Sequence, residues 1–113
     1  MKHFLLLLAF PAILGQKCDK HNSGLPACVQ GKIDSIKALP RGNPPAEVSE
    51  YIFNGRPVYL FTANCCDQFL LLYDGSCNYL CAPSGGLTGK GDGQCAGFYE
   101  QAKYVKRVWK DER

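Results

Sequence analysis

Seven cysteines in a chain of 113 residues constrain the fold more than any other feature of the sequence. They follow an apolar segment, residues 4–14, which a short basic start precedes, and this is the pattern of a secretory signal sequence. Cysteines in small exported proteins typically form disulfides, because the environment outside the cytoplasm is oxidising. We therefore expect a disulfide-bonded protein that is exported and is periplasmic, anchored at the outer membrane or secreted.

The sequence divides into a signal sequence over residues 1–17, a polar tether over residues 18–27 and one disulfide-stabilised domain over residues 28–113. The apolar run is shorter than the roughly 20 residues that a membrane-spanning helix needs. Loss of residues 1–15 removes one of the 13 basic residues and leaves 12 against 10 acidic ones. That charge is too small to indicate binding to nucleic acid, and we expect a monomer without a nucleic-acid partner.

Cys18 has two possible fates. Cleavage after Gly15 would leave it as an odd thiol or as a partner for another cysteine. Lipidation would instead make it the mature N-terminus and a membrane anchor, and would leave six cysteines for three disulfides. The even count favours the lipid anchor, whereas Lys17 opposes it, because a small residue normally precedes a lipidated cysteine.

An amphipathic helix is expected at the start of the domain, from about Pro26. The apolar side chains Val29, Ile33, Ile36 and Leu39 recur at a spacing of three to four residues, which places them on one face of a helix. Such a helix needs a sheet to cover.

The sheet is predicted from two hairpins. Residues 48–53 and 56–61 flank Asn54-Gly55, the dipeptide that best tolerates the positive φ angles of a two-residue turn. Residues 69–73 and 76–81 repeat this pattern around Asp74-Gly75. The C-terminal segment fits either a helix or a strand, and a short helix near residues 98–102 followed by a strand is favoured. The fold class is α+β, with the helix packed on a four- to five-stranded antiparallel meander.

Six cysteines are the candidate disulfide partners: Cys28, Cys65, Cys66, Cys77, Cys81 and Cys95. Cys77 and Cys81 are four residues apart on one predicted strand, too far to pair with each other. A bond between the neighbours Cys65 and Cys66 is disfavoured because the ring would be strained. A two-residue turn at Asp74-Gly75 would bring Cys66 diagonally beside Cys81, so Cys66–Cys81 is the first choice.

The loop before Cys95 is the candidate recognition loop, with Gly85, Gly86, Thr88, Lys90 and Asp92 as its candidate residues. Its glycines lack the spacing of a phosphate-binding loop. It has one carboxylate, Asp92, too few for a calcium loop, and we expect this side chain to bond local backbone instead.

The histidines of the chain, His3 and His21, precede the domain, so a zinc site or a histidine base is not expected within it. We expect no metal, no cofactor and no catalytic residue.

Several short blocks of the sequence resemble the DUF6970 family, a small cysteine-containing domain of unknown function in exported and often lipid-anchored bacterial proteins. The blocks are Cys28-Val29-Gln30-Gly31-Lys32-Ile33-Asp34, Asn43-Pro44-Pro45-Ala46, Cys65-Cys66-Asp67, Leu72-Tyr73-Asp74, Cys81-Ala82-Pro83, Thr88-Gly89-Lys90-Gly91-Asp92-Gly93 and Trp109-Lys110-Asp111. The resemblance covers residues 26–113 and implies export and a compact domain. It implies no activity, and Lys17 departs from the lipid-attachment pattern of such proteins.

The expected function is that of a non-enzymatic extracytoplasmic binding module for an unknown protein or small-molecule ligand. A protease-inhibitor-like domain is an alternative, because small disulfide-bonded domains with exposed loops also serve that role. A thiol or redox protein that uses the vicinal Cys65 and Cys66 is a further alternative, although this pair lacks the Cys-x-x-Cys spacing of thiol oxidoreductases.

Overall fold

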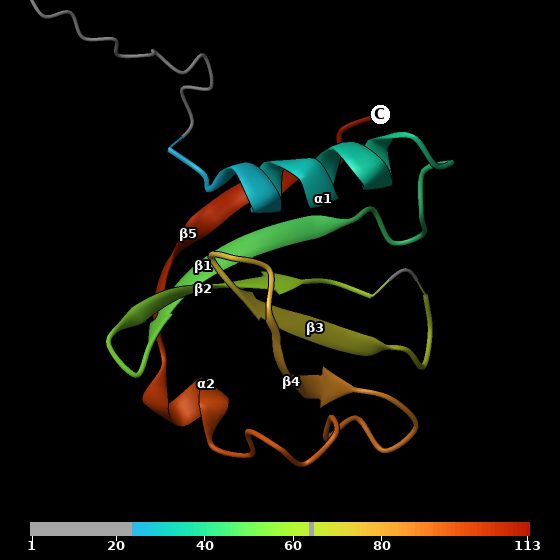
Figure 1. Cartoon of the computed structure of the whole chain (residues 1–113). Helices are drawn as coiled ribbons and strands as arrows, with labels where there is room; N and C mark the ends of the chain where they lie inside the picture. Colours follow the sequence, from blue (N-terminus) through green and yellow to red (C-terminus); the bar gives the residue numbers. More distant parts are fainter. Residues whose placement is uncertain (1–23, 64) are drawn as a thin grey trace, which may run out of the picture.

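The computed structural model of the chain describes residues 24–63 and 65–113. Its elements are α1 (Ala27–Lys37), β1 (Glu47–Phe53), β2 (Arg56–Phe61), β3 (Phe69–Asp74), β4 (Tyr79–Gly85), α2 (Phe98–Gln101) and β5 (Lys103–Lys110) (Figure 1). The expected signal sequence, Cys18 and the tether as far as residue 23 lie outside the described residues. Within the described part, no helix has the length and apolar character needed to cross a membrane.

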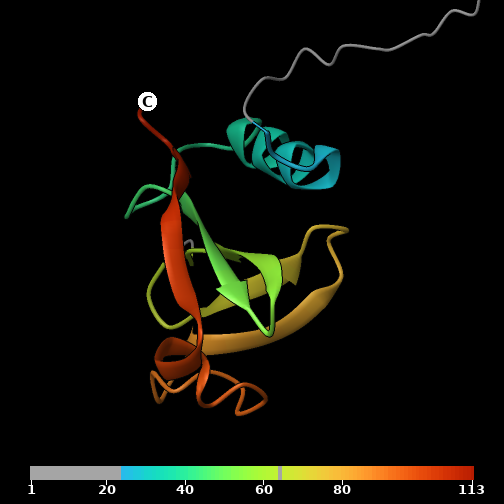
Figure 2. The same ribbon diagram turned by 90° about the vertical axis from the view of Figure 1, so that its left-hand side faces the viewer.

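The strands form one sheet in the order β4-β3-β2-β1-β5, and every neighbouring pair is antiparallel. Strands β1 to β4 follow one another as a meander, and β5 returns to pair with β1. The sheet is strongly twisted, so that its two edge strands, β4 and β5, run at a steep angle to each other (Figure 2). The predicted α+β fold is confirmed, including the short helix and final strand at the C-terminus.

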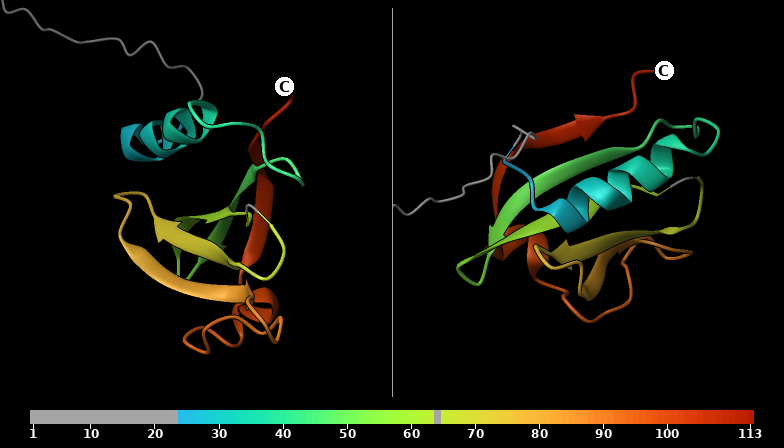
Figure 3. Two further views of the ribbon diagram at one scale, coloured as in Figure 1. Left: turned by 90° about the vertical axis from the view of Figure 1, so that its right-hand side faces the viewer. Right: turned by 45° about the horizontal axis from the view of Figure 1, so that its top comes forward.

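Both faces of the sheet are covered. Tyr59 and Phe61 of β2 pack with Val29 and Ile33 of α1 on one face. The alternate residues of β2, Val58 and Leu60, join the second cluster on the other face, with Leu72, Cys81 and Phe98. Figure 3 shows α1 over one face and α2 on the opposite side. Burial of both faces of β2 explains why its apolar residues form a continuous run rather than an alternating pattern.

Helix α1 ends earlier than the apolar spacing predicts. Val29 and Ile33 are buried as expected, but Leu39 is 57% exposed and does not belong to the buried stripe. The helix ends at Lys37, and the amide of Leu39 donates to the carbonyl of Ile36 at 3.0 Å. This tighter turn rotates Leu39 away from the sheet, since three residues per turn replace 3.6.

The first hairpin turn lies where the sequence predicts it. Asn54 and Gly55 have φ angles of 55° and 78°, and Phe53 pairs with Arg56 across the turn. Pro57 lies opposite Ile52, before the pairing of β2 with β3 begins at Val58. A proline is tolerated at that position because no ladder bond to β3 is required there.

Replacing Gly55 with Val is therefore expected to lower the free energy of unfolding by about 1 to 3 kcal/mol, because a β-branched residue would be held at positive φ. The added Cβ would contact nothing within 4 Å, so the cost comes from the backbone alone. Asn54→Gly is the matched control, since glycine also tolerates this turn, and should melt close to wild type. Equal urea denaturation curves for wild type and Gly55→Val would contradict the turn assignment.

The second hairpin differs from the prediction. β3 ends at Asp74 and β4 begins at Tyr79, so the connection is longer than two residues. The Asp74 carboxylate accepts hydrogen bonds from the amides of Ser76 and Asn78, both at 2.9 Å, and Cys77 has a φ angle of 64°. The longer loop shifts the register, so that Leu72 lies opposite Cys81 and Cys66 is not brought beside it.

The register shift also changes the disulfides. Cys28 of α1 bonds Cys77 in the β3–β4 loop, Cys81 bonds Cys95, and Cys65 bonds its neighbour Cys66. The expected Cys66–Cys81 bond is wrong, because Cys81 faces the core cluster that contains Cys95. The argument against Cys65–Cys66 is also wrong, whereas Cys77 and Cys81 have different partners as predicted. Three disulfides indicate an oxidising, extracytoplasmic environment.

The C-terminal segment is fixed to α1 through Asp111, which is only 2% exposed. The guanidinium of Arg113 donates to both carboxylate oxygens of Asp111, at 2.9 and 2.8 Å, and to the carbonyl of Lys37 at 3.1 Å. The amide of Asp111 donates to the carbonyl of Ala46 at 2.9 Å. One ion pair therefore joins the end of β5, the end of α1 and the segment that leads into β1.

This ion pair predicts an acid-sensitive stability. The hydrogen bonds from Arg113 lower the pKa of Asp111 to about 2, while an aspartate in an unfolded chain titrates near 3.9. The folded pKa is depressed, so the stabilisation is complete above about pH 4 and is lost as the pH falls toward 2. Asp111→Asn should lower the melting temperature at pH 7 and flatten its fall between pH 4 and pH 2. An unchanged slope in that window would contradict the assignment.

Candidate functional site

The candidate recognition loop runs from Gly85 to Gly93 and is called the glycine loop below. It covers the outer edge of β4. The amide of Asp92 donates to the carbonyl of Ala82 at 2.9 Å, and the amide of Ala82 donates back to the Asp92 carboxylate at 3.1 Å. The hydroxyl of Tyr79 donates to the same carboxylate at 2.6 Å, and the amide of Gln94 donates to its other oxygen at 2.9 Å. Asp92 thus bonds the backbone N–H and carbonyl of Ala82 on the side of β4 that pairs with no other strand.

The charge on Asp92 is held in place by these bonds. The hydrogen bond from Tyr79 is the main cause that lowers the pKa of Asp92, and the same bond raises the pKa of Tyr79 to about 12. Asp92 is therefore ionised and fully engaged at neutral pH. Its role in the fold is the local backbone bonding expected from the sequence.

The other candidate residues of the loop divide into two groups. Gly85 and Gly86 lie against β3, since a Cβ on either would meet the backbone or ring of Phe69 within 3.0 Å. Thr88 and Lys90 are exposed, and the Thr88 hydroxyl accepts a hydrogen bond from the Lys90 amide at 3.1 Å. Of the five candidate residues, Thr88 and Lys90 thus present exposed side chains.

The vicinal pair Cys65–Cys66 lies in the connection between β2 and β3. Cys66 is exposed and has a φ angle of 49°, while Cys65 is half-buried. By contrast, Cys81 of the Cys81–Cys95 pair is 2% exposed. The vicinal pair is therefore the one most open to a thiol in solution.

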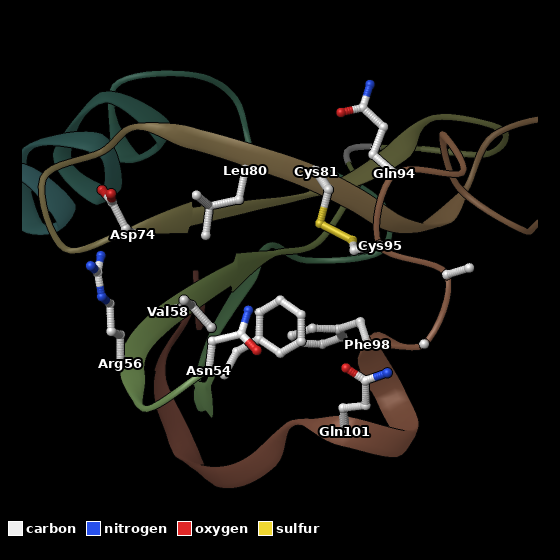
Figure 4. A pocket seen from close by; sticks show the side chains of 13 residues that line it. Asn54, Arg56, Val58, Asp74, Leu80, Cys81, Gln94, Cys95, Phe98 and Gln101 are labelled. Carbon is white, nitrogen blue, oxygen red and sulfur yellow. A yellow bond between two sulfur atoms is a disulfide. The ribbon is translucent and has the colours of Figure 1, made fainter.

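A cavity of about 660 Å³ lies beside α2, on the face of the sheet opposite α1 (Figure 4). Its uncharged polar lining includes three side-chain amides, Asn54, Gln94 and Gln101. None of these three side-chain amide groups has a hydrogen-bond partner among the described residues, although the backbone N–H of Gln94 donates to Asp92. Figure 4 shows the Asn54 and Gln101 side chains on one side of the cavity, whereas the Gln94 amide points away from them. The cavity volume lies within the range of about 300 to 1,000 Å³ that is common for small-molecule sites.

The charged residues of the cavity are Arg56 and Asp74, which Figure 4 shows toward one end, with Gln94 and Gln101 toward the other. Asp74 is engaged within its own loop, where Asn78 donates to it from both backbone and side chain. These bonds are the main cause that lowers the pKa of Asp74, and Arg56 is a minor one. Arg56 forms no ion pair with a described residue.

The apolar wall of the cavity combines Phe53, Val58, Leu80 and Phe98 with the Cys81–Cys95 disulfide. Phe53 and Phe98 meet edge to face with ring centroids 5.1 Å apart, which fixes the shape of the wall. The disulfide holds the segment that carries Gln94 against β4. Asn54 lies in the first hairpin turn, between β1 and β2.

Sequence reasoning identified Asn54 as a turn residue and missed the cavity. The polar residues of the cavity come from the first hairpin, the end of β3, the segment after the glycine loop and α2. The sequence spacing of these residues follows no recognisable motif. Among the described residues, no group of three or more His, Cys, Asp or Glu side chains could hold a metal ion.

The fold and the cystine pattern define a small disulfide-bonded α+β domain with one helix across a five-stranded antiparallel sheet. The family model described as domain of unknown function (DUF6970) matches residues 34–111, and the chain belongs to this family. The match includes the sheet, α2 and every residue that lines the cavity. No curated protein and no solved structure matches the chain.

Proposed function

We propose that the protein is a non-enzymatic, extracytoplasmic binding module that holds a small polar ligand in the cavity beside α2. The observation that carries this proposal is the cavity of about 660 Å³, whose lining includes the side-chain amides of Asn54, Gln94 and Gln101, none of which bonds another described residue. The three side chains are exposed and hydrated in the free protein, so a polar ligand would exchange their bound water for its own donors and acceptors.

Export is the second part of this proposal. We propose that the chain is processed after its apolar N-terminal segment and is periplasmic, attached to the outer membrane through Cys18 or secreted. The disulfides support an oxidising compartment. Mass spectrometry of the mature N-terminus from cells would distinguish a lipid on Cys18 from plain cleavage after Gly15. A mature protein that retains residues 1–15 would contradict export by this route.

A blocked cavity tests the binding proposal. Ala96 lines the cavity and its side chain is exposed, so Ala96→Phe should fill the space without disturbing the core. Ala27→Phe adds the same ring at an exposed position of α1 and is the matched control. In equilibrium dialysis against a pool of sugars, amino acids, nucleosides and organic acids, wild type and Ala27→Phe should retain a compound that Ala96→Phe does not. A folded Ala96→Phe variant that retains the same compound would rule out the cavity.

A second candidate function is thiol exchange, and the exposure of the vicinal pair Cys65–Cys66 favours it. A dithiol reductant would transfer two electrons and two protons to this pair and leave as its own disulfide. Limited reduction followed by alkylation should then label Cys65 and Cys66 first, with little change in melting temperature. Labelling that begins at Cys81 and Cys95, or only on unfolding, would remove this candidate.

A further inference from the structure

A groove of about 550 Å³ lies between α1 and β3, on the face of the sheet opposite the cavity beside α2. We call it the α1–β3 groove. Its floor is formed by Phe69, Leu71 and Tyr73, which alternate along β3 and therefore share one face of the strand. Phe61 of β2, opposite Leu71, is 6% exposed beneath α1, whereas Phe69 is 43% exposed. The helix thus covers β2 and leaves an apolar strip of β3 open to solvent.

The α1 side of the groove is also apolar. It presents Ile36 and, just past the end of the helix, Leu39. Leu39 and Phe69 both line the groove, and both belong to the exposed large apolar side chains of the domain. Exposed apolar side chains that flank one groove mark a ligand or interaction site, whereas single exposed ones are common on any surface. A strand rises about 3.3 Å per residue, so the strip from Phe69 to Tyr73 is about 13 Å long and fits an extended hydrocarbon chain.

One end of the groove is positively charged. Lys32 is the charged residue among the described residues that line the groove, and its ammonium lies 4.1 Å from the centroid of the Tyr73 ring. It forms no ion pair with a described residue. The acidic residue of α1, Asp34, accepts a hydrogen bond from Gln30 and pairs with Lys37 instead. The groove therefore combines an apolar strip with one cation whose charge is balanced by no carboxylate of the described lining.

We propose that the α1–β3 groove binds a fatty acid. The hydrocarbon chain lies along Ile36, Leu71 and Phe69, because this contact removes apolar surface of both molecules from water. The carboxylate lies beside Lys32 at the Tyr73 end, where it keeps its contact with solvent and avoids the cost of burying a charge. This site is separate from the cavity beside α2, and neither proposal depends on the other.

Decanoate, decylamine and decanol are the probes, because they share one hydrocarbon chain and carry a negative, a positive and no charge at neutral pH. Each is titrated in low salt, below micelle formation, into protein with carbon-13 labelled methyl groups. With decanoate, the methyl signals of Ile36, Leu39 and Leu71 should shift together on one saturable curve. Those of Val58 and Leu80, in the cavity beside α2, should stay unchanged. Decanoate should bind roughly two- to tenfold more tightly than decylamine. Octanoate should bind more weakly than decanoate, by up to about fourfold for each methylene lost.

Two charge variants test the head group, and two leucine variants test the chain. Lys32→Glu should reverse the preference, so that decylamine binds more tightly than decanoate, and should leave decanol unchanged. Lys106→Glu makes the same change in net charge on β5, outside the groove, and should keep the wild-type preference. Leu39→Ser should weaken all three probes by roughly three- to tenfold, because it removes apolar contact. Leu87→Ser, at an even more exposed leucine outside the groove, should weaken none of them.

The fatty-acid assignment is overturned if decanoate shows no saturable binding, or if it shifts Val58 and Leu80 in place of the groove methyl groups. A decanoate preference that survives Lys32→Glu would also overturn it. Equal losses in the Leu39 and Leu87 variants would mean non-specific adsorption of the chain and would have the same consequence. Groove methyl signals that shift with protein concentration, in the absence of any probe, would identify a second copy of the chain as the occupant instead.

Discussion

Replacing Gly91 with Ala is expected to lower the free energy of unfolding by about 3 to 5 kcal/mol, because it combines positive φ with a backbone clash. Gly91 has a φ angle of 76°, and its amide donates to the carbonyl of Gly85 at 3.0 Å. A Cβ there would lie 2.7 Å from the carbonyl carbon of Pro83 and 2.8 Å from the nitrogen of Ser84, and closer still to the carbonyl oxygen of Ala82. These atoms belong to β4 and cannot move aside without opening the sheet.

Gly89→Ala is the matched control within the same loop. Gly89 has nearly the same φ angle, 78°, but a Cβ there would contact nothing within 4 Å. Only the backbone conformation is disturbed, at a cost of about 1 to 2 kcal/mol. Chemical denaturation of both variants separates the clash from the φ angle. Equal losses in the two variants would mean that the loop does not lie against β4 at Gly91.

The second large effect is expected at the Cys28–Cys77 disulfide. It joins residues 49 apart in sequence and fixes α1 to the loop between β3 and β4. On a chain-entropy basis, its removal should cost about 4 kcal/mol, against about 3 kcal/mol for Cys81–Cys95, whose separation is 14. A bond between sequence neighbours restricts the unfolded chain far less.

The comparison uses paired substitutions so that no variant keeps a lone thiol. Cys28→Ala with Cys77→Ala, Cys81→Ala with Cys95→Ala, and Cys65→Ala with Cys66→Ala should lose stability in that descending order. Cys81 is also buried, so part of the loss at the second pair reflects packing rather than entropy. A vicinal double variant as unstable as the Cys28 and Cys77 variant would contradict this ranking.

The parts of the fold that depend on local chemistry could be predicted from the sequence. Asn54-Gly55 fixes a turn because both residues tolerate positive φ, and the adjacent β-branched and aromatic residues form the strands of the hairpin. Helix α1 follows from the spacing of Val29 and Ile33. Each of these signals lies within a few residues of the structure that it specifies.

The predicted two-residue turn of the second hairpin failed for a physical reason. Asp74-Gly75 is a common turn dipeptide, but the Asp74 side chain bonds Ser76 and Asn78 and supports a longer loop. Cys77 adopts positive φ in that loop, where its disulfide to Cys28 holds it under α1. The tertiary bond and the side-chain bonds together override the dipeptide preference and shift the register that decides the partner of Cys81.

The cavity could not be predicted because no local pattern encodes it. Asn54 and Gln101 are 47 positions apart and meet only because the sheet curls and α2 returns beneath the first hairpin. The glycine loop is the more conspicuous sequence pattern, but its glycines serve mainly to bring the backbone close to β3 and β4. A dense glycine motif is therefore a signal of close packing here, while the polar cavity lies on the residues that follow it.

The most direct test of ligand binding at this cavity is the nitrogen-15 spectrum of the side-chain amides in the presence of a bound polar ligand. The NH₂ groups of Asn54, Gln94 and Gln101 give their own signals, and single substitutions assign them. A ligand in the cavity should shift all three together along one saturable binding curve, while Gln30 on α1, whose amide donates to Asp34 at 3.0 Å, stays unchanged. Saturating shifts confined to the backbone amides of Thr88 and Lys90 in the glycine loop, with the three side-chain amides unmoved, would contradict the account.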